Sequence, residues 1–212
     1  MFAQTQNELH NMKHMSILAV SLLALVACTP EKKQEADYSQ YVNPMIGTDF
    51  TGNTYPGAQV PFGMVQLSPD NGLPGWDRIS GYFYPDTTIA GFSHTHLSGT
   101  GAGDLYDISF MPVTRPYKEA PAPLGIYSTF SHNDEAASAG YYRVLLKDYN
   151  INVELTATER CGIQRYTFPE AEASVFLNLK KAMNWDFTMD SKIEVVDSTT
   201  IRGYRLSQGW SP

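Results

Sequence analysis

The sequence predicts a mostly β protein, an antiparallel β-sandwich preceded by an amino-terminal signal peptide. Runs rich in β-branched and aromatic residues follow one another closely after residue 140, and groups of turn-forming residues separate them. These connections are too short to hold crossover helices, so neighbouring strands should run antiparallel. No stretch beyond the signal peptide shows the 3.6-residue apolar period of a helix. Two packed sheets would bury the apolar faces of such strands.

The first 27 residues have the pattern of a signal peptide. Their apolar run, Ile17–Ala27, is 11 residues long and too short to cross a bilayer as a helix. The run leads into Leu25-Val26-Ala27-Cys28, which resembles the lipobox of bacterial lipoproteins. In that class the signal is removed before the cysteine, whose thiol then carries a lipid. We therefore expect lipidation of Cys28 and a cell-envelope lipoprotein, on the periplasmic or the outer-membrane surface; an ordinary secretory signal is the alternative.

Residues 28–40 are polar and predict a flexible tether between the lipid anchor and the folded domain. Eleven residues precede Met12, which is unusual for a signal peptide, so Met12 or Met15 is an alternative start of translation. The remaining residues, 41–212, are enough for a single sizeable core.

The charge of the chain argues against one class of partner. The net charge is −7, and the basic residues form neither a stripe nor a cluster, so we expect no nucleic acid as a partner. Aromatic residues make up 12% of the chain, and 13 of them are tyrosines. That composition suits strands and carbohydrate-binding surfaces alike, without deciding between them.

Cys161 has no partner for a disulfide if Cys28 carries a lipid, because the chain has two cysteines. It lies in a run from Val153 to Ile163 whose alternate residues are mostly apolar, so we expect it on the buried face of a strand. A buried thiol packs as a small apolar group. The sequence therefore does not favour cysteine-based catalysis.

Strand signals dominate the second half of the chain. Turn-forming groups such as Asp148-Tyr149-Asn150 and Pro169-Glu170 separate one run from the next. The predicted strands are Tyr141–Leu146, Ile151–Thr158, Gly162–Phe168, Ala173–Leu179, Ile193–Val196 and Thr200–Leu206.

The first half, residues 41–123, is rich in glycine and proline and has room for short strands only. Loops this long within a domain are uncommon and tend to be functional, so we expect the binding surface here. The short strands fit Met64–Ser68, Gly81–Tyr84 and Ile108–Val113.

The segment GFSHTHLSGTGAGDLYD, residues 91–107, is the least typical of a protein core. On an extended backbone His94 and His96 would project from one face, an arrangement that suits a transition metal. No second His or Cys pair completes such a site, so we favour ring nitrogens that bond to substrate hydroxyls or to the loop backbone. Gly99–Gly103 is not a phosphate loop, because no strand–turn–helix pattern and no Lys-Ser/Thr pair follows. Its glycines would let the backbone approach a ligand or a neighbouring domain.

Trp76 lies in a loop of glycine and proline, either packed inward or exposed as a platform for a sugar ring. Asp70, Asp77 and Asp86 offer carboxylates that a glycosidase pair would need. Asp70 and Asp86 follow prolines in turn-like settings, which are ordinary places for aspartate. No pair stands out as general acid and base, so we assign no catalytic residue.

Three segments, YVNPMIGTDFTGNTYPGAQVPFGMVQLSPD (41–70), SGYFYPD (80–86) and GFSHTHLSGTGAGD (91–104), resemble the amino-terminal domain of glycoside hydrolase family 92. The resemblance continues, in order and spacing, through VELTATERCGIQRYTFP (153–169), AMNWDF (182–187) and IRGYRLSQGWSP (201–212). Members are bacterial exo-acting α-mannosidases, abundant in gut Bacteroides-like organisms.

The resemblance implies an amino-terminal β-sandwich joined to a carboxy-terminal (α/α)6 barrel. It also implies hydrolysis of mannose-containing glycans with inversion, here expected to be of the α-1,2-mannosidase type, with the help of a calcium ion. In the family the acid, the base and the calcium ligands come from the barrel, so we expect no metal site in this chain. Phe62 and Gly63 match the family's PFG segment, which approaches the terminal mannose. Trp76 falls where a family tryptophan contacts the neighbouring sugar, and we count His94 and His96 with these substrate-binding candidates.

The sequence stops at Pro212, where the resemblance implies that the sandwich is incomplete and the barrel absent. We therefore expect a gene fragment or a prematurely terminated relative, inactive alone and without bound calcium, whose partner is the missing barrel. Two alternatives remain open. One is a glycan-binding lipoprotein without catalysis, and the other is a scaffold whose loops pack against a partner.

Overall fold

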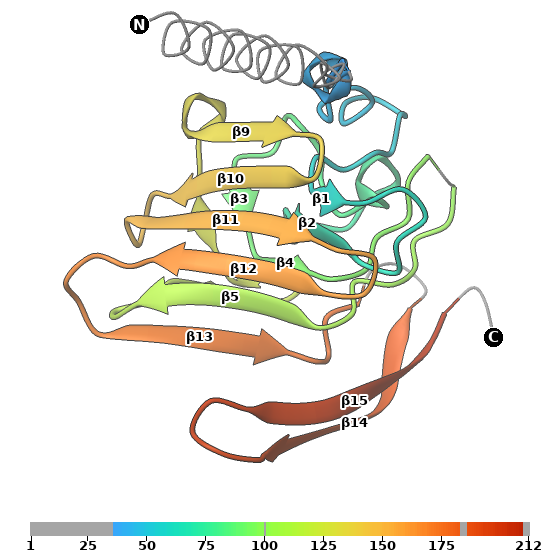
Figure 1. The fold of residues 1–212 in the computed structure, drawn as a ribbon. Coiled ribbons are helices and arrows are strands. Elements are labelled where there is room, and N and C mark those ends of the chain that lie inside the picture. The colour runs from blue at the N-terminus through green and yellow to red at the C-terminus, as the bar shows by residue number, and fades with distance from the viewer. Residues whose placement is uncertain (1–35, 100, 183–185, 210–212) are drawn as a thin grey trace, which may run out of the picture. The chain divides into compact units, whose positions relative to one another are not determined.

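Two stacked antiparallel sheets form the body of the protein, as its computed structural model shows (Figure 1). One sheet has five strands in the order β1-β2-β4-β5-β13, and the other has four in the order β12-β11-β10-β9. The structure describes residues 36–99, 101–182 and 186–209, and its strands all belong to a unit that begins at Tyr38. The predicted β-sandwich is thus confirmed.

The elements are short in the first half of the chain and longer in the second. Helix within the described ranges is limited to three 3-10 turns: η1 Ser39–Tyr41, η2 Trp76–Arg78 and η3 His132–Asp134. The strands are β1 Ala58–Gln59, β2 Gln66–Asp70, β3 Thr88–Ile89, β4 Gly91–Ser93, β5 Ser109–Thr114, β6 Glu119–Ala120, β7 Gly125–Ile126, β8 Ser128–Thr129, β9 Glu135–Ser138, β10 Tyr141–Leu146, β11 Ile151–Ala157, β12 Gly162–Thr167, β13 Ala173–Asn178, β14 Phe187–Val195 and β15 Ile201–Gln208.

The four-stranded sheet follows the sequence pattern closely. Strand β10 has the predicted bounds, and β11 and β12 each end one residue before theirs. Inward and outward residues alternate along β10 and β11, as the period of two requires. The register places three inward residues of β10 opposite three of β11: Tyr142↔Leu155, Val144↔Val153 and Leu146↔Ile151. These six side chains form one wall of the core.

The five-stranded sheet supplies the other wall of the core, through Leu67, Phe92, Met111 and Val113. The structure differs from the prediction at Gly81–Tyr84, which does not form a strand. Asn71 explains the difference, because its own backbone N–H and its side chain take the hydrogen bonds that a neighbouring strand would make. Its N–H donates to the carbonyl of Gly81 (2.8 Å), and its Oδ1 accepts from the N–H of Phe83 (2.5 Å).

Strands β14 and β15 form a separate two-stranded hairpin that is longer than the predicted strands. A bulge between Thr188 and Asp190 interrupts the register. Most residues of the hairpin are exposed, but the Arg205 side chain is buried and reaches across to Asp107 and Asp186. The hairpin is therefore attached to the sandwich through a charged contact.

Cys161 is exposed, so its predicted burial is wrong. The apolar alternation that includes Val153 and Leu155 holds along β11 but ends at the β11–β12 turn. There the N–H of Thr158 donates to the carbonyl of Cys161 (2.8 Å), which reverses the chain and places the cysteine in the turn.

We expect Cys161 to react with a thiol reagent in the folded protein at a rate close to that in the unfolded chain, because its side chain is open to solvent. A Cys28→Ser variant leaves Cys161 as the single thiol, and colour release from Ellman's reagent measures the rate. Reaction that waits for unfolding, seen as acceleration only in denaturant, would contradict the exposed turn.

The predicted signal peptide (residues 1–27), Cys28 and most of the predicted tether lie outside the described residues. Within the described ranges, no helix is long and apolar enough to cross a membrane.

Candidate functional site

Phe62 is fully exposed at the tip of a tight turn between β1 and β2. Its φ of +59° lies in the left-handed region, which costs a bulky residue about 1 kcal/mol or more. Two backbone hydrogen bonds hold the turn: Gly63 N–H donates to Val60 (3.0 Å), and Met64 N–H donates to Glu159 (2.7 Å). A Cβ at position 63 would lie 2.9 Å from Val60 Cγ2, so glycine fits best there. The turn thus presents an aromatic ring to solvent on a fixed backbone.

Trp76 begins the η2 turn and is 58% exposed, which is the platform arrangement and not the inward anchor. Arg78 in the same turn makes a two-pronged ion pair with Asp86, at 2.6 Å from Nε and 2.5 Å from Nη2. Its guanidinium also lies over the ring of Phe83, at 4.6 Å from the centroid. These contacts fix the turn that carries the indole.

His94 faces the start of β5 and the start of β12. Its Nδ1 lies 2.9 Å from the carbonyl oxygen of Ile108, and its ring meets Phe110 edge-on. A Cβ at Gly162 would lie 2.7 Å from the imidazole, so the ring fits against bare backbone. Burial lowers the pKa of His94, although the bond to Ile108 opposes that shift.

His96 is buried, and both of its ring nitrogens have partners. Nδ1 lies 2.7 Å from the carbonyl oxygen of Gln66, while Nε2 lies 2.9 Å from Asp70 Oδ1 and 3.0 Å from Ser93 Oγ. His94 thus bonds to loop backbone, at Ile108, whereas the partners of His96 are the β2 backbone at Gln66 and the side chains of Asp70 and Ser93. We therefore propose no sugar contact for His96.

The Asp70–His96–Ser93 cluster is not a nucleophilic triad. Ser93 and Asp70 approach the same ring nitrogen, and all three side chains are shut away from solvent. Lys181 adds a cation, with Nζ 3.1 Å from Asp70 Oδ2. Burial alone would raise the pKa of Asp70, but Lys181 and His96 outweigh burial and lower it. Asp70 is therefore an ionised structural anchor.

This anchor was missed by sequence reasoning, which treated Asp70 as an ordinary turn residue. Its Pro-Asp context gives no hint of burial, and Lys181 lies 111 positions farther along the chain. Asp86 is likewise engaged with Arg78. Two of the three carboxylates considered for a glycosidase pair thus serve in ion pairs.

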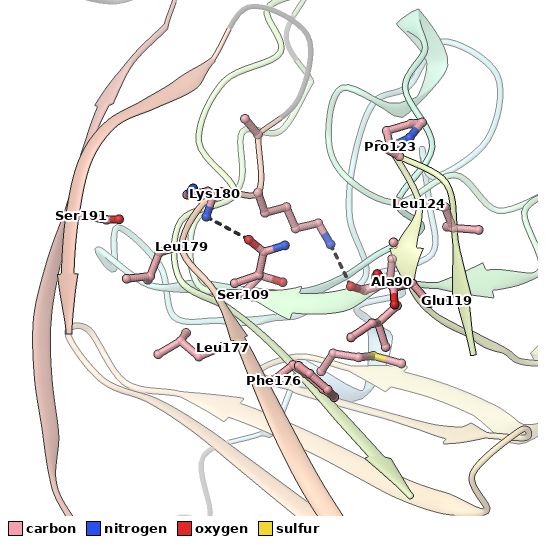
Figure 2. A pocket seen from close by; sticks show the side chains of 18 of the residues that line it. Ala90, Ser109, Glu119, Pro123, Leu124, Phe176, Leu177, Leu179, Lys180 and Ser191 are labelled. Atoms are coloured by element: carbon pink, nitrogen blue, oxygen red, sulfur yellow. Dashed lines mark hydrogen bonds between the residues drawn. The ribbon is translucent and has the colours of Figure 1, made fainter. Parts of the chain in front are cut away.

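A cavity of about 750 Å³ lies between β5, β13, β14 and the β6–β7 hairpin (Figure 2). Leu177, Leu179 and Phe176 of β13 and its extension form much of its apolar wall. Lys181 is one of the residues that line it, and its Nζ donates to the carbonyl of Ala90 (3.3 Å). None of the predicted site residues lines it, so it is separate from the exposed rings of Phe62 and Trp76.

Among the described residues, no three His, Cys, Asp or Glu side chains are arranged to hold a metal ion.

The comparison with known families agrees with the resemblance noted above. The sequence model described as the glycosyl hydrolase family 92 N-terminal domain matches residues 41–212. The chain belongs to glycoside hydrolase family 92. It corresponds to that family's amino-terminal domain, which accounts for the two-sheet architecture.

Solved structures from this family resemble the chain in fold. The family GH92 α-mannosidase of Bacteroides thetaiotaomicron, solved alone and in complex with mannoimidazole, has a TM-score of 0.77 and 43% sequence identity, over 82% of this chain and 24% of that one. A family GH92 inverting mannosidase of the same bacterium has a TM-score of 0.65 and 29% identity, over 85% of this chain and 24% of that one. The family 92 chain thus spans about a quarter of the length of these solved relatives.

A curated relative is an uncharacterized secreted glycosidase of Arthroderma benhamiae. It is 26% identical over 172 residues, which cover 76% of this chain and 21% of that protein.

Proposed function

We propose that this family 92 domain forms part of the sugar site of a calcium-dependent, inverting exo-α-mannosidase of the α-1,2 type. Its share of that site is the Phe62-Gly63 turn, which faces the terminal mannose, and the Trp76 indole, which stacks on the neighbouring sugar. The acid, the base and the calcium ligands belong to a carboxy-terminal (α/α)6 barrel, so the 212 residues alone release no mannose.

The exposure of the two aromatic rings supports this role most strongly. Phe62 and Trp76 present large apolar surfaces to solvent, although a domain of this size has a core in which to bury them. An exposed indole suits the C–H face of a sugar ring, and its N–H can bond to a hydroxyl. The backbone strain at Phe62 points the same way, because strained residues persist where function needs them.

The location proposed is the cell envelope, with Cys28 as the lipid-anchored residue. The lipobox-like sequence supports the anchor. A relative described as a secreted glycosidase supports export.

Trp76→Ala should weaken binding of an α-mannobioside by about tenfold, because it removes the stacking surface for one sugar ring. Titration of the chain, followed by NMR line shifts, measures the affinity. Tyr204→Ala removes another half-exposed aromatic ring, on the β14–β15 hairpin, and should leave the affinity unchanged.

The remaining outcomes separate the alternatives. Binding without mannose release, with or without calcium, is what we expect of this chain alone. Failure of the wild-type chain to bind any mannoside would contradict the sugar site and favour a purely structural role. Calcium-dependent release of mannose by the chain would contradict the assignment of the catalytic groups to the barrel.

A further inference from the structure

The Trp76 indole packs directly against the glycine-rich loop. A Cβ built at Gly101 would lie 3.2 Å from Cη2 and 3.4 Å from Cζ2 of the indole. These separations are shorter than ordinary carbon–carbon contacts of 3.5–4.0 Å. Among the described residues, chain neighbours aside, no other heavy atom would lie within 4 Å of that Cβ. The absence of a side chain at position 101 therefore determines how close the indole can lie to the loop.

The same segment also holds the opposite end of the η2 turn. The Tyr106 hydroxyl donates to the carbonyl of Ile79 and, at 3.3 Å, to that of Arg78. Tyr106 is 1% exposed and has a φ of +69°, so the surroundings hold it in a strained conformation. Thr95 secures this bend by accepting from the N–H of Tyr106 (3.1 Å). Tyr106 thus holds the carboxy-terminal end of the η2 turn, while the indole at its amino-terminal end lies against Gly101.

Gly99, two residues earlier, provides a useful contrast. Its N–H donates to the carbonyl of Asn53 (2.6 Å), and its φ of +67° favours glycine. In the part of the chain that the structure describes, and apart from its chain neighbours, a Cβ there would meet no atom within 4 Å. Glycine is therefore favoured at position 99 by the backbone conformation of the loop, whereas at position 101 it leaves space for the neighbouring Trp76 side chain.

We propose that Gly101 is a positioning residue for Trp76: its missing side chain sets the tilt of the indole at which the ring is offered to a sugar. The sugar part of this statement rests on the proposed function, whereas the position of the ring does not. A methyl group at 101 displaces the indole toward solvent, where the ring has room to move because it is already more than half exposed.

The first test needs no sugar. The indole N–H signal of Trp76 is identified among the chain's three tryptophans by its loss in Trp76→Phe. Gly101→Ala should shift this signal, while Gly99→Ala, which strains the same loop without reaching the ring, should leave it in place. An unshifted signal in Gly101→Ala, or an equal shift in Gly99→Ala, overturns the positioning role.

A double-mutant cycle tests the proposal even if Gly101→Ala also destabilises the loop. Phenylalanine lacks the second ring that a Cβ at 101 would meet, so Gly101→Ala should lower the melting temperature less in Trp76→Phe than in the wild-type chain. Equal losses of melting temperature in both backgrounds overturn the proposal.

In the mannobioside titration, Gly101→Ala should weaken binding about three- to tenfold in the wild-type chain and should not weaken it further in Trp76→Ala. If the indole signal shifts but the affinity for the mannobioside does not change, the link between Gly101 and sugar binding is refuted. If the wild-type chain binds no mannobioside, the proposed function is refuted, and the indole N–H signal alone still tests whether Gly101 positions Trp76.

Discussion

Asp70→Asn lowers the free energy of unfolding by about 3–5 kcal/mol, the range expected when one partner of a buried ion pair is removed. Asp70 is 1% exposed, and it faces His96 and Lys181, whose side chains are almost as deeply buried. The amide keeps the shape of the carboxylate but leaves Lys181 without a negative partner. Urea unfolding of the wild type and the variant, followed by tyrosine and tryptophan fluorescence, measures the difference.

The difference in free energy of unfolding between the wild type and Asp70→Asn should decrease as the pH falls. The pKa of Asp70 is lower in the folded protein than its ordinary value. Its ionised form therefore contributes stability above the unfolded pKa of about 3.9, and that contribution is lost as the pH falls through the folded value. The gap between wild type and Asp70→Asn should be full at pH 7 and should shrink in strong acid.

Glu154→Gln is the matched control for Asp70→Asn, because Glu154 makes a surface ion pair with Arg165. Side-chain hydrogen bonds from Arg165 and Tyr141 lower the pKa of Glu154 to about 2, yet the pair is open to solvent and should matter little for stability. Equal losses in the two variants would show that Asp70 is not the buried anchor described above.

Arg205→Ala should detach the β14–β15 hairpin, at a local cost of about 3–5 kcal/mol. The Arg205 guanidinium is buried, contacts Asp107 and lies 2.7 Å from Asp186 Oδ2. Among the described residues Asp186 Oδ1 has no hydrogen-bond partner, so Arg205 is the main compensation for this carboxylate. Removal of the Arg205 guanidinium leaves the buried Asp186 carboxylate without its ion-pair partner. Either the hairpin then detaches, which exposes the carboxylate to water, or the carboxylate becomes protonated.

Hydrogen exchange gives the readout for Arg205→Ala. Amides of β14 and β15 should exchange faster by about 100-fold or more, while those of β10 and β11 keep their rates. Burial raises the pKa of Asp186, so acid that protonates it should reduce the effect. Arg202→Ala breaks an exposed pair with Glu194 on the same hairpin and should change little. Unchanged exchange in Arg205→Ala would show that other contacts hold the hairpin.

Periodicity predicted the second half of the fold well, because strands β10 to β12 alternate between core and solvent and short turns separate them. It failed where side chains replaced a strand partner, as Asn71 does for residues 81–84, and where a turn broke the alternation at Cys161. Both cases depend on local hydrogen bonds, which the spacing of apolar residues in the sequence does not reveal.

The candidate site was predictable in part. Phe62, Gly63 and Trp76 stand out through family resemblance, and the structure places both rings at the surface. The buried role of His96 was not predictable, since its partners Gln66 and Asp70 lie 30 and 26 positions away. Only the fold brings such residues together.

The contact between Asp107 and the β15 strand has a consequence for synthesis of the protein on the ribosome. Ser207 donates to Asp107 across 100 positions of sequence, and Arg205 reaches the same carboxylate across 98. At about 5–20 residues per second, the segment around Asp107 waits roughly 5–20 s for these partners to be made. During that interval Asp107 lacks both of these partners, and among its side-chain hydrogen bonds with described residues only the one from Thr95 joins residues that have already been made.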